Sequence, residues 1–226
     1  MNETANQQVD LSEEALLTLA ASVRHRKYPI VKTILDGSLA WLMLLMLSPV
    51  FLVLVVGVRL SSPGPIVYSS TRFGLNGKRF SMYKFRSMRD RTPAEILLEQ
   101  RSVEKQGFLN KNTNDSRVTP FGRFIRSTSL DELPQILNVA LGHMSFVGPR
   151  PVMPQMTKPF PNFQSARLLV KPGITGLWQI RDRQNASHVS FMWAHDLEYL
   201  QTYSFVVDTW TLLRTLPSVI VKRGAY

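Results

Sequence analysis

Two adjacent carboxylates, Asp131 and Glu132, are the residues of this sequence whose types and spacing best suit chemistry. Ser129 precedes Glu132 by three residues, as in a capping box, and Pro134 is tolerated only in a first helical turn. The spacing predicts a helix that begins close to both carboxylates and keeps them ionised, as a nucleophile or a magnesium ligand requires. Repulsion between the two charges can raise one pKa toward that of a general base. Acidic residues that only cap a helix show the same spacing, so both interpretations stay open.

Basic segments elsewhere favour the chemical interpretation. Residues 84–86, 148–151, 171–176 and 181–183 combine lysine or arginine with glycine, proline or aspartate, and Arg123 and Arg126 precede the carboxylates. Loops of this kind present cations and backbone N–H groups, and several together suit a diphosphate. Each segment taken singly is equally typical of a turn with a solvated charge.

Other common chemistries find no support in the sequence. It contains neither a G-x-x-x-x-G-K-[ST] loop nor a G-x-G-x-x-G turn, so a P-loop NTPase and a dinucleotide-binding fold are not indicated. The absence of cysteine excludes disulfides and thiolate metal sites. The four histidines show no ligand spacing, so a zinc site is not expected.

The overall charge indicates an anionic partner. Among 226 residues, 27 Lys and Arg face 16 Asp and Glu, which gives a formal net charge of +11. Nucleic acid, a phospholipid surface and a phosphorylated substrate all fit that excess. The length suits one catalytic domain with an appendage.

An uncharged apolar segment, residues 37–58, reaches the length of about 20 residues that spans a bilayer. Ser48 and Pro49 lie at its centre, where proline predicts a kink or a break in the helix. Basic residues flank both ends, which places both ends on the cytoplasmic side. A helix that enters and leaves by one leaflet satisfies both features, and an ordinary kinked span is the alternative. Lys32 and Asp36, one helical turn apart, fit a pair at the headgroup level or a solvated surface pair.

The remaining elements position the candidate residues. Residues 66–68 and 79–85 around Asn76-Gly77 predict a β-hairpin. Helices are expected over 130–141, closed by Gly142, and over 187–201, with an exposed helical insertion at 91–113. Residues 208–221 are amphipathic and fit the membrane interface or an ordinary core-facing helix. We expect a polar N-terminal tail (1–28), a membrane helix (29–60) and a catalytic domain (61–226).

Short motifs follow one another from about Lys32 to the C-terminus. They are Ser48-Pro49, Gly64-Pro65, Arg72-Phe-Gly-x-Asn-Gly-Lys78, Lys84-Phe-Arg-Ser-Met88, Asp115-x-Arg-x-Thr119, Gly122-Arg123, Ser129-Leu-Asp-Glu-Leu-Pro-Gln135, Asn138, Met144-Ser-x-Val-Gly-Pro-Arg-Pro151, Pro172-Gly-Ile-Thr-Gly-Leu-Trp-Gln179 and Asp196-x-x-Tyr199. This ordered series resembles the bacterial sugar transferase family, the monotopic phosphoglycosyl transferases that begin exopolysaccharide, capsule and O-antigen assembly.

The resemblance implies a mainly helical α+β fold with a small β-hairpin and interfacial amphipathic helices. It also implies a re-entrant membrane helix broken at Ser48-Pro49, on the cytoplasmic face of the bacterial inner membrane. In such enzymes the aspartate of the dyad, here Asp131, attacks the β-phosphate of a UDP-sugar and UMP leaves. Undecaprenyl phosphate, a polyprenyl phosphate, then takes the phosphosugar. Asp131 would also bind Mg²⁺, and Glu132 would help to activate the acceptor.

The same matching assigns phosphate-binding roles to five cations: Lys84, Arg86, Arg126, Arg150 and Arg183. Ser70, Ser116 and Asp182 depart from the usual glutamine, proline and glycine of the family. The expected partners are a UDP-sugar, undecaprenyl phosphate and an anionic phospholipid membrane, and the chain can form a homo-oligomer. Glucose or galactose is the expected sugar. A catalytically weakened scaffold of a polysaccharide assembly complex is the alternative, and a nucleic-acid-binding protein is not expected because it leaves the apolar segment unexplained.

Overall fold

The computed structural model describes residues 11–24, 28–90, 92, 115–151, 161–181 and 189–220. Its helices are α1 (Glu13–Arg24), α2 (Tyr28–Met46), α3 (Ser48–Ser61), α5 (Pro120–Ser127), α6 (Gln135–Ala140), α8 (Pro161–Arg167), α9 (Leu177–Arg181), α10 (Val189–Thr202) and α11 (Phe205–Ile220). The strands are β1 (Val67–Phe73), β2 (Arg79–Phe85), β3 (Ser145–Val147) and β4 (Gly173–Thr175), and η1 (Leu75–Gly77) and η2 (Leu130–Glu132) are 3-10 turns. The predicted mainly helical α+β class is confirmed, whereas the insertion predicted at 91–113 lies outside the described residues apart from Thr92.

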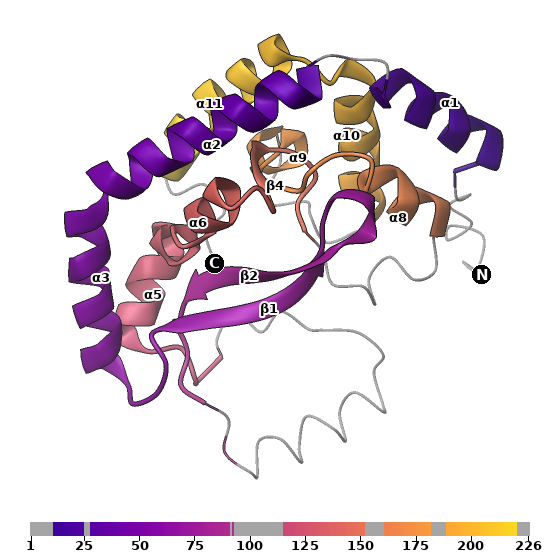
Figure 1. Cartoon of the computed structure of the whole chain (residues 1–226). Coiled ribbons are helices and arrows are strands. Elements are labelled where there is room, and N and C mark those ends of the chain that lie inside the picture. The colour runs from indigo at the N-terminus through magenta and orange to yellow at the C-terminus, as the bar shows by residue number, and fades with distance from the viewer. Residues whose placement is uncertain are drawn as a thin grey trace, which may run out of the picture.

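The apolar segment forms two helices that meet at Leu47 (Figure 1). The backbone N–H of Leu47 still donates to Met43, at 2.8 Å, but proline has no N–H with which to continue the series. Pro49 instead stands in the first turn of α3, and the Ser48 hydroxyl donates to the Leu45 carbonyl at 2.8 Å. The predicted helix break at Ser48-Pro49 is therefore confirmed. By length and composition alone, α2 is able to cross a membrane.

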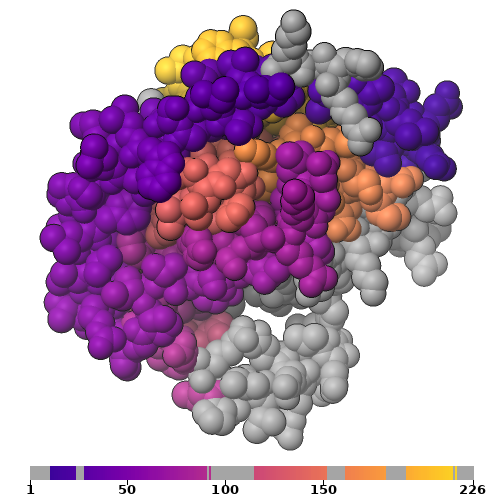
Figure 2. Space-filling model, in the orientation of Figure 1, coloured from indigo at the N-terminus to yellow at the C-terminus, as the bar shows by residue number. Residues whose placement is uncertain are grey.

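Helices α2, α3 and α11 expose apolar side chains on the outside of the molecule. Ile30 and Leu45 of α2 are 71% and 73% exposed, and Val206 of α11 is 74% exposed. The inward side of α11 carries Asp208 and Thr211, both buried. Val207 and Leu212 of the same helix pack against the core, so α11 turns one side to the core and exposes apolar side chains on the other. Figure 2 shows α2 and α3 as a continuous outer band.

A buried polar cluster joins α2 to α11, which lies beside it in Figure 1. The Lys32 ammonium donates to the Asp208 carboxylate and lies 3.5 Å from Asp36. The Tyr199 hydroxyl donates to the other oxygen of Asp208 at 2.8 Å, and the Ser145 hydroxyl donates to Asp36 at 2.6 Å. Lys32 is only 5% exposed, so a solvated surface pair with Asp36 is the wrong interpretation. Interior partners satisfy these groups, which leaves the outer surface apolar.

The predicted β-hairpin is confirmed. β1 and β2 pair antiparallel, and the turn residues Asn76 and Gly77 have φ values of 55° and 74°. Asparagine and glycine tolerate this left-handed conformation best. Asn138 of α6 fastens the helix to β2, because its amide accepts from the Tyr83 N–H at 3.0 Å and donates to the Ser81 carbonyl at 2.7 Å. The end of β2 is thereby held beside the chain segment that carries the two carboxylates.

Three other sequence expectations can be compared with the structure. The helix expected over 187–201 is confirmed as α10. Gly142 follows α6 with a φ of 76° and closes it as expected. The helix expected over 130–141 is shorter than predicted, because the 3-10 turn η2 and Pro134 precede the α-helical residues.

Candidate active site

Three of the predicted site residues converge from separate elements. Lys84 at the end of β2 donates to Oε1 of Glu132 at 2.7 Å. Arg150, in the loop after β3, donates from Nη2 to the same oxygen at 2.5 Å, and its Nη1 lies 3.4 Å from Oε2. The side chains of Lys84 and Arg150 remain 23% and 28% exposed. Two cations that reach solvent are thus held next to Asp131.

The local backbone contradicts the predicted capping box. Ser129 has a left-handed conformation, with φ 57° and ψ 16°, whereas an N-cap residue is normally extended. Its side chain makes no capping hydrogen bond, and the Glu132 carboxylate binds two cations instead of reaching back to the Ser129 N–H. The capping interpretation is therefore wrong. The positive-φ turn at Ser129 brings Asp131 and Glu132 into a short 3-10 turn instead.

The two adjacent carboxylates differ in their affinity for a proton. Burial raises the pKa of Asp131 to about 6. The positive charge of Lys84 lowers this pKa and the negative charge of Glu132 raises it, but burial has the largest effect. Burial also opposes ionisation of Glu132, yet Arg150 and Lys84 together hold its pKa well below the usual range. The expectation that one pKa rises is confirmed, with burial as the larger cause. In the described part of the chain, the Asp131 carboxylate forms no hydrogen bond or ion pair, which leaves it available to a ligand.

The other predicted cations have different positions. Arg126 of α5 is near enough to Asp131 for its charge to lower the pKa of that carboxyl. Arg86 is buried and donates to the carbonyl of Ser62 in the loop after α3. Gly64 packs so closely on this guanidinium that a Cβ would lie 2.3 Å from Nη1. Arg86 therefore holds that loop, and Arg183, like Asp182, lies outside the described residues.

Arg72 is a candidate cation that sequence reasoning did not select. The register pairs Tyr68 with Lys84 and Arg72 with Phe80, so Tyr68 and Arg72 share the face of the hairpin that carries Lys84. Burial lowers the pKa of Arg72, and the positive charge of Arg150 lowers it further. Strand β1 runs to Phe73, beyond the predicted residues 66–68, and the alternation of side chains along it identifies Arg72 once its register with β2 is known.

The loop that carries Arg150 is fixed by strand pairing. β3 and β4 run parallel, and the Gly148 N–H donates to the Thr175 carbonyl at 2.9 Å. The next carbonyl, that of Pro149, accepts from Gly173 at 3.0 Å. A Cβ on Gly148 would lie 2.5 Å from the Lys171 carbonyl oxygen, so this approach requires glycine. The backbone hydrogen bonds of Gly148 and Pro149 thus fix the position of Arg150, the next residue in the loop.

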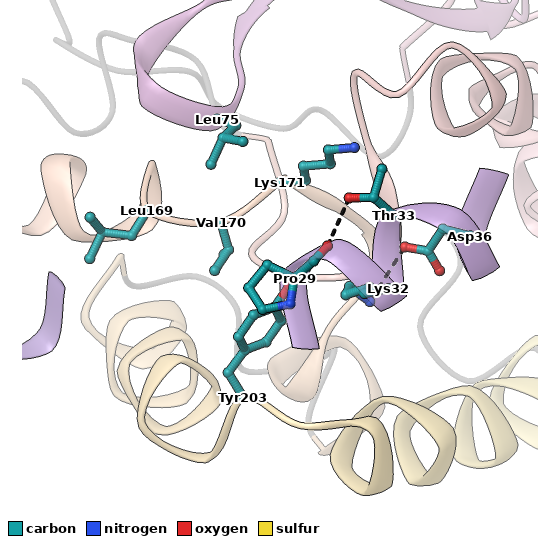
Figure 3. A pocket seen from close by; sticks show the side chains of 9 residues that line it. All are labelled: Pro29, Lys32, Thr33, Asp36, Leu75, Leu169, Val170, Lys171 and Tyr203. Carbon is teal, nitrogen blue, oxygen red and sulfur yellow. Dashed lines mark hydrogen bonds and ion pairs between the residues drawn. The ribbon is translucent and has the colours of Figure 1, made fainter. Parts of the chain in front are cut away.

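A separate cavity lies where α2 begins, beside the tip of the hairpin (Figure 3). Its lining residues are Pro29, Lys32, Thr33, Asp36, Leu75, Leu169, Val170, Lys171 and Tyr203. The Thr33 hydroxyl donates to the Pro29 carbonyl at 2.9 Å, and burial lowers the pKa of Lys171. None of the predicted site residues lines this cavity, so it is not part of the carboxylate site.

Comparisons with known proteins agree with the motifs. The profile described as bacterial sugar transferase matches residues 27–222. The exopolysaccharide production protein ExoY of Rhizobium meliloti (strain 1021) is 38% identical over 188 residues, which are 81% of this chain and 82% of ExoY. The UDP-glucose:undecaprenyl-phosphate glucose-1-phosphate transferase of Escherichia coli (strain K12) is 38% identical over 84% of this chain and 40% of its own length. The undecaprenyl-phosphate galactose phosphotransferase of Salmonella typhimurium (strain LT2) is 35% identical over 95% of this chain and 45% of its own. Because the profile covers nearly the whole chain and ExoY is matched over most of its length, this chain belongs to the bacterial sugar transferase family.

Proposed function

We propose that this chain transfers hexose-1-phosphate from a UDP-sugar to undecaprenyl phosphate and releases UMP, the first membrane step of exopolysaccharide or related glycan synthesis. The observation that carries the proposal is the convergence of Lys84 and Arg150 on Glu132, beside the half-buried Asp131, whose carboxylate has no hydrogen-bond or ion-pair partner among the described residues. The names of the relatives from Escherichia coli and Salmonella typhimurium describe this reaction with glucose and galactose. Glucose or galactose is accordingly the proposed sugar.

The proposed reaction has two displacements at one phosphorus. A carboxylate oxygen of Asp131 attacks the β-phosphorus of the UDP-sugar, and the bond from that phosphorus to the bridging oxygen breaks. The electron pair leaves with UMP, and the phosphosugar remains on Asp131 as an acyl phosphate. A phosphate oxygen of undecaprenyl phosphate then attacks the same phosphorus. The bond to Asp131 breaks, which restores the carboxylate and forms the undecaprenyl diphosphosugar.

The site charges suit these steps. With a pKa of about 6, Asp131 is mostly ionised at neutral pH and is more basic than an ordinary aspartate. Lys84 and Arg150 lie beside the dyad and are partly exposed, so they can neutralise charge on the β-phosphate. The low pKa of Glu132 favours a role in positioning these cations. That Glu132 also activates the acceptor stays a prediction, as does phosphate binding by Arg86, Arg126 and Arg183.

We propose Mg²⁺ as the cofactor, with Asp131 as its protein ligand. Within the described residues no group of three or more metal-binding side chains occurs, so the protein does not provide a complete cage. Mg²⁺ commonly binds one or two carboxylates and completes its shell with water and substrate phosphates, which fits Asp131, a carboxylate without a partner in the described part of the chain. When bound, the ion would neutralise the diphosphate. Glu132 partly neutralises Lys84 and Arg150. A further cation would therefore help to balance the two negative charges on the diphosphate of the UDP-sugar.

We propose that α2 and α3 form a re-entrant membrane helix on the cytoplasmic face of the inner membrane. This proposal agrees with the membrane helix that the sequence predicts over residues 29–60. The break at Ser48-Pro49, the exposed apolar faces and the basic flanks support this arrangement. Helix α11 would lie in the interface with Val206 and Leu213 toward lipid. This arrangement places a lipid-linked acceptor and a cytoplasmic nucleotide sugar on the same side of the membrane.

The test uses detergent-solubilised protein with Mg²⁺, undecaprenyl phosphate and one radiolabelled donor at a time. The donors are UDP-glucose, UDP-galactose and their N-acetylated counterparts. Wild type and Glu198→Gln, which changes a carboxylate paired with Arg181 at the surface, are expected to form labelled lipid. Asp131→Asn is expected to form at least about 100-fold less. Equal labelling by Asp131→Asn would exclude Asp131 as the nucleophile, and no labelling by wild type with any donor would refute the transfer.

A second measurement separates a covalent route from direct transfer. Wild type is incubated with the active donor and Mg²⁺ without undecaprenyl phosphate, and its intact mass is recorded. The proposal predicts an added hexose phosphate that is absent from Asp131→Asn and disappears when acceptor is added. Stoichiometric UMP release without any adduct on the protein would contradict the acyl-phosphate intermediate.

A further inference from the structure

Arg150 is held by its backbone as well as by its side chain. Nη2 of Arg167, at the end of α8, donates to the Arg150 carbonyl at 2.5 Å. This contact follows the two strand-like bonds of Gly148 and Pro149, so three successive loop residues have a fixed partner. Pro151 adds a further restraint, because the residue before a proline is confined to extended conformations.

Arg167 is itself anchored inside the protein. Its Nε lies 2.9 Å from Oδ2 of Asp196 on α10, and the side chains of Arg167 and Asp196 are only 5% and 3% exposed. The guanidinium also lies over the ring of Phe163, 5.7 Å from its centroid. A group this deeply buried is not placed to touch a diphosphate that enters from solvent.

The contacts form one series from α10 to the candidate site. Asp196 pairs with Arg167, Arg167 binds the carbonyl of Arg150, and the side chain of Arg150 binds Glu132 beside Asp131. Arg150 has a long side chain, so a small shift of its backbone displaces the guanidinium. Displacements of about 1 Å commonly cost on the order of 100-fold in rate.

We propose that Arg167, anchored by Asp196, is a positioning residue that sets the location of Arg150 for phosphoryl transfer. The inference rests on the proposed function, and it assigns to Arg167 no contact with either substrate. Asp196 holds the buried guanidinium of Arg167, and that guanidinium donates to the carbonyl of Arg150. The two contacts together fix the backbone from which the Arg150 side chain reaches Glu132.

The test is a double-mutant cycle on labelled-lipid formation. Arg167→Lys retains the charge beside Asp196 but loses the planar fork that reaches both Asp196 and the Arg150 carbonyl. We expect it to lower kcat/KM about 10–100-fold in the wild-type background. In the Arg150→Ala background the same change is expected to cost less than about threefold, because the guanidinium that Arg167 positions is gone.

The controls distinguish positioning from damage to the fold. Glu198→Gln alters a carboxylate of the same helix α10, which pairs with Arg181 at the surface, and is expected to retain activity within about twofold. If Arg167→Lys unfolds, the cycle is repeated with the double variant Arg167→Met, Asp196→Leu, since replacing both members of a buried pair by apolar residues is often tolerated.

The outcomes separate this inference from the proposed function. Equal fold-losses in the two Arg150 backgrounds, or no loss in the wild-type background, overturn the positioning role while the transfer itself stands. No labelled lipid from wild type refutes the proposed function, and the positioning role with it. A loss confined to proteins that retain Arg150 supports the inference.

Discussion

Replacing Asp131 with asparagine should abolish transfer and at the same time stabilise the folded protein at high pH. Burial raises the pKa of Asp131 from its ordinary value of 3.8 to about 6. At 1.36 kcal/mol for each pKa unit, the ionised carboxylate destabilises the native state by at most about 3 kcal/mol above pH 6. Asparagine has nearly the same shape and no charge, so Asp131→Asn removes this cost.

The sign of the effect depends on pH in a defined way. Because the folded pKa exceeds the unfolded one, the cost is greatest above pH 6 and disappears as the pH falls toward 3.8. The gain in the free energy of unfolding should therefore shrink from about 3 kcal/mol at pH 8 to about 1.5 kcal/mol at pH 5. For a chain of this length, the gain at pH 8 corresponds to a rise of roughly 6–12 °C in melting temperature.

The assay is thermal unfolding in detergent at pH 8 and pH 5, with Glu132→Gln as the matched control. Glu132 is the neighbouring carboxylate, and Lys84 and Arg150 stabilise its charge. Glu132→Gln should lower stability by about 1–3 kcal/mol, because both cations lose a charged partner. A melting temperature of Asp131→Asn below that of wild type at pH 8, or an equal gain at both pH values, would refute the raised pKa of Asp131.

Three further predictions concern rate, packing and helix propensity. Single-turnover UMP release should decrease as the pH falls through about 6, by about tenfold for each unit below it, because Asp131 must be ionised to attack; a rate that increases on acidification would contradict this. Gly122→Ala should lower the free energy of unfolding by about 1–3 kcal/mol, because its Cβ would lie 1.9 Å from the Ser87 carbonyl oxygen. A Cβ added at Gly37 would have no heavy atom within 4 Å, so Gly37→Ala should instead stabilise helix α2 by about 0.5–1 kcal/mol. Denaturant unfolding of both variants measures these changes.

The elements that were predicted well depend on local signals. Pro49 lacks an N–H, so the helix breaks beside it whatever the chain packs against. Asn76 and Gly77 adopt the left-handed turn conformation that few other residues tolerate. These properties act over a few residues, and the sequence states them directly.

The capping box failed because it depends on backbone geometry that the sequence does not state. Ser129 is left-handed rather than extended, and Glu132 finds stronger partners in Lys84 and Arg150. The Lys32–Asp36 pair shows the same limit, since the spacing was correct and the buried environment was not predicted. In both cases a partner distant in the sequence outweighs the local pattern.

The sequence by itself determined the apolar segment and its break, the hairpin, the dyad and the motifs that place the chain in its family. Only the tertiary structure decided the partners and the proton affinity of each carboxylate of the dyad. Glu132 meets cations 48 and 18 residues away in the chain, whereas Asp131 is half-buried and has no hydrogen-bond or ion-pair partner in the described residues. A pKa reflects burial and the charges within a few ångströms, and those are properties of the folded chain.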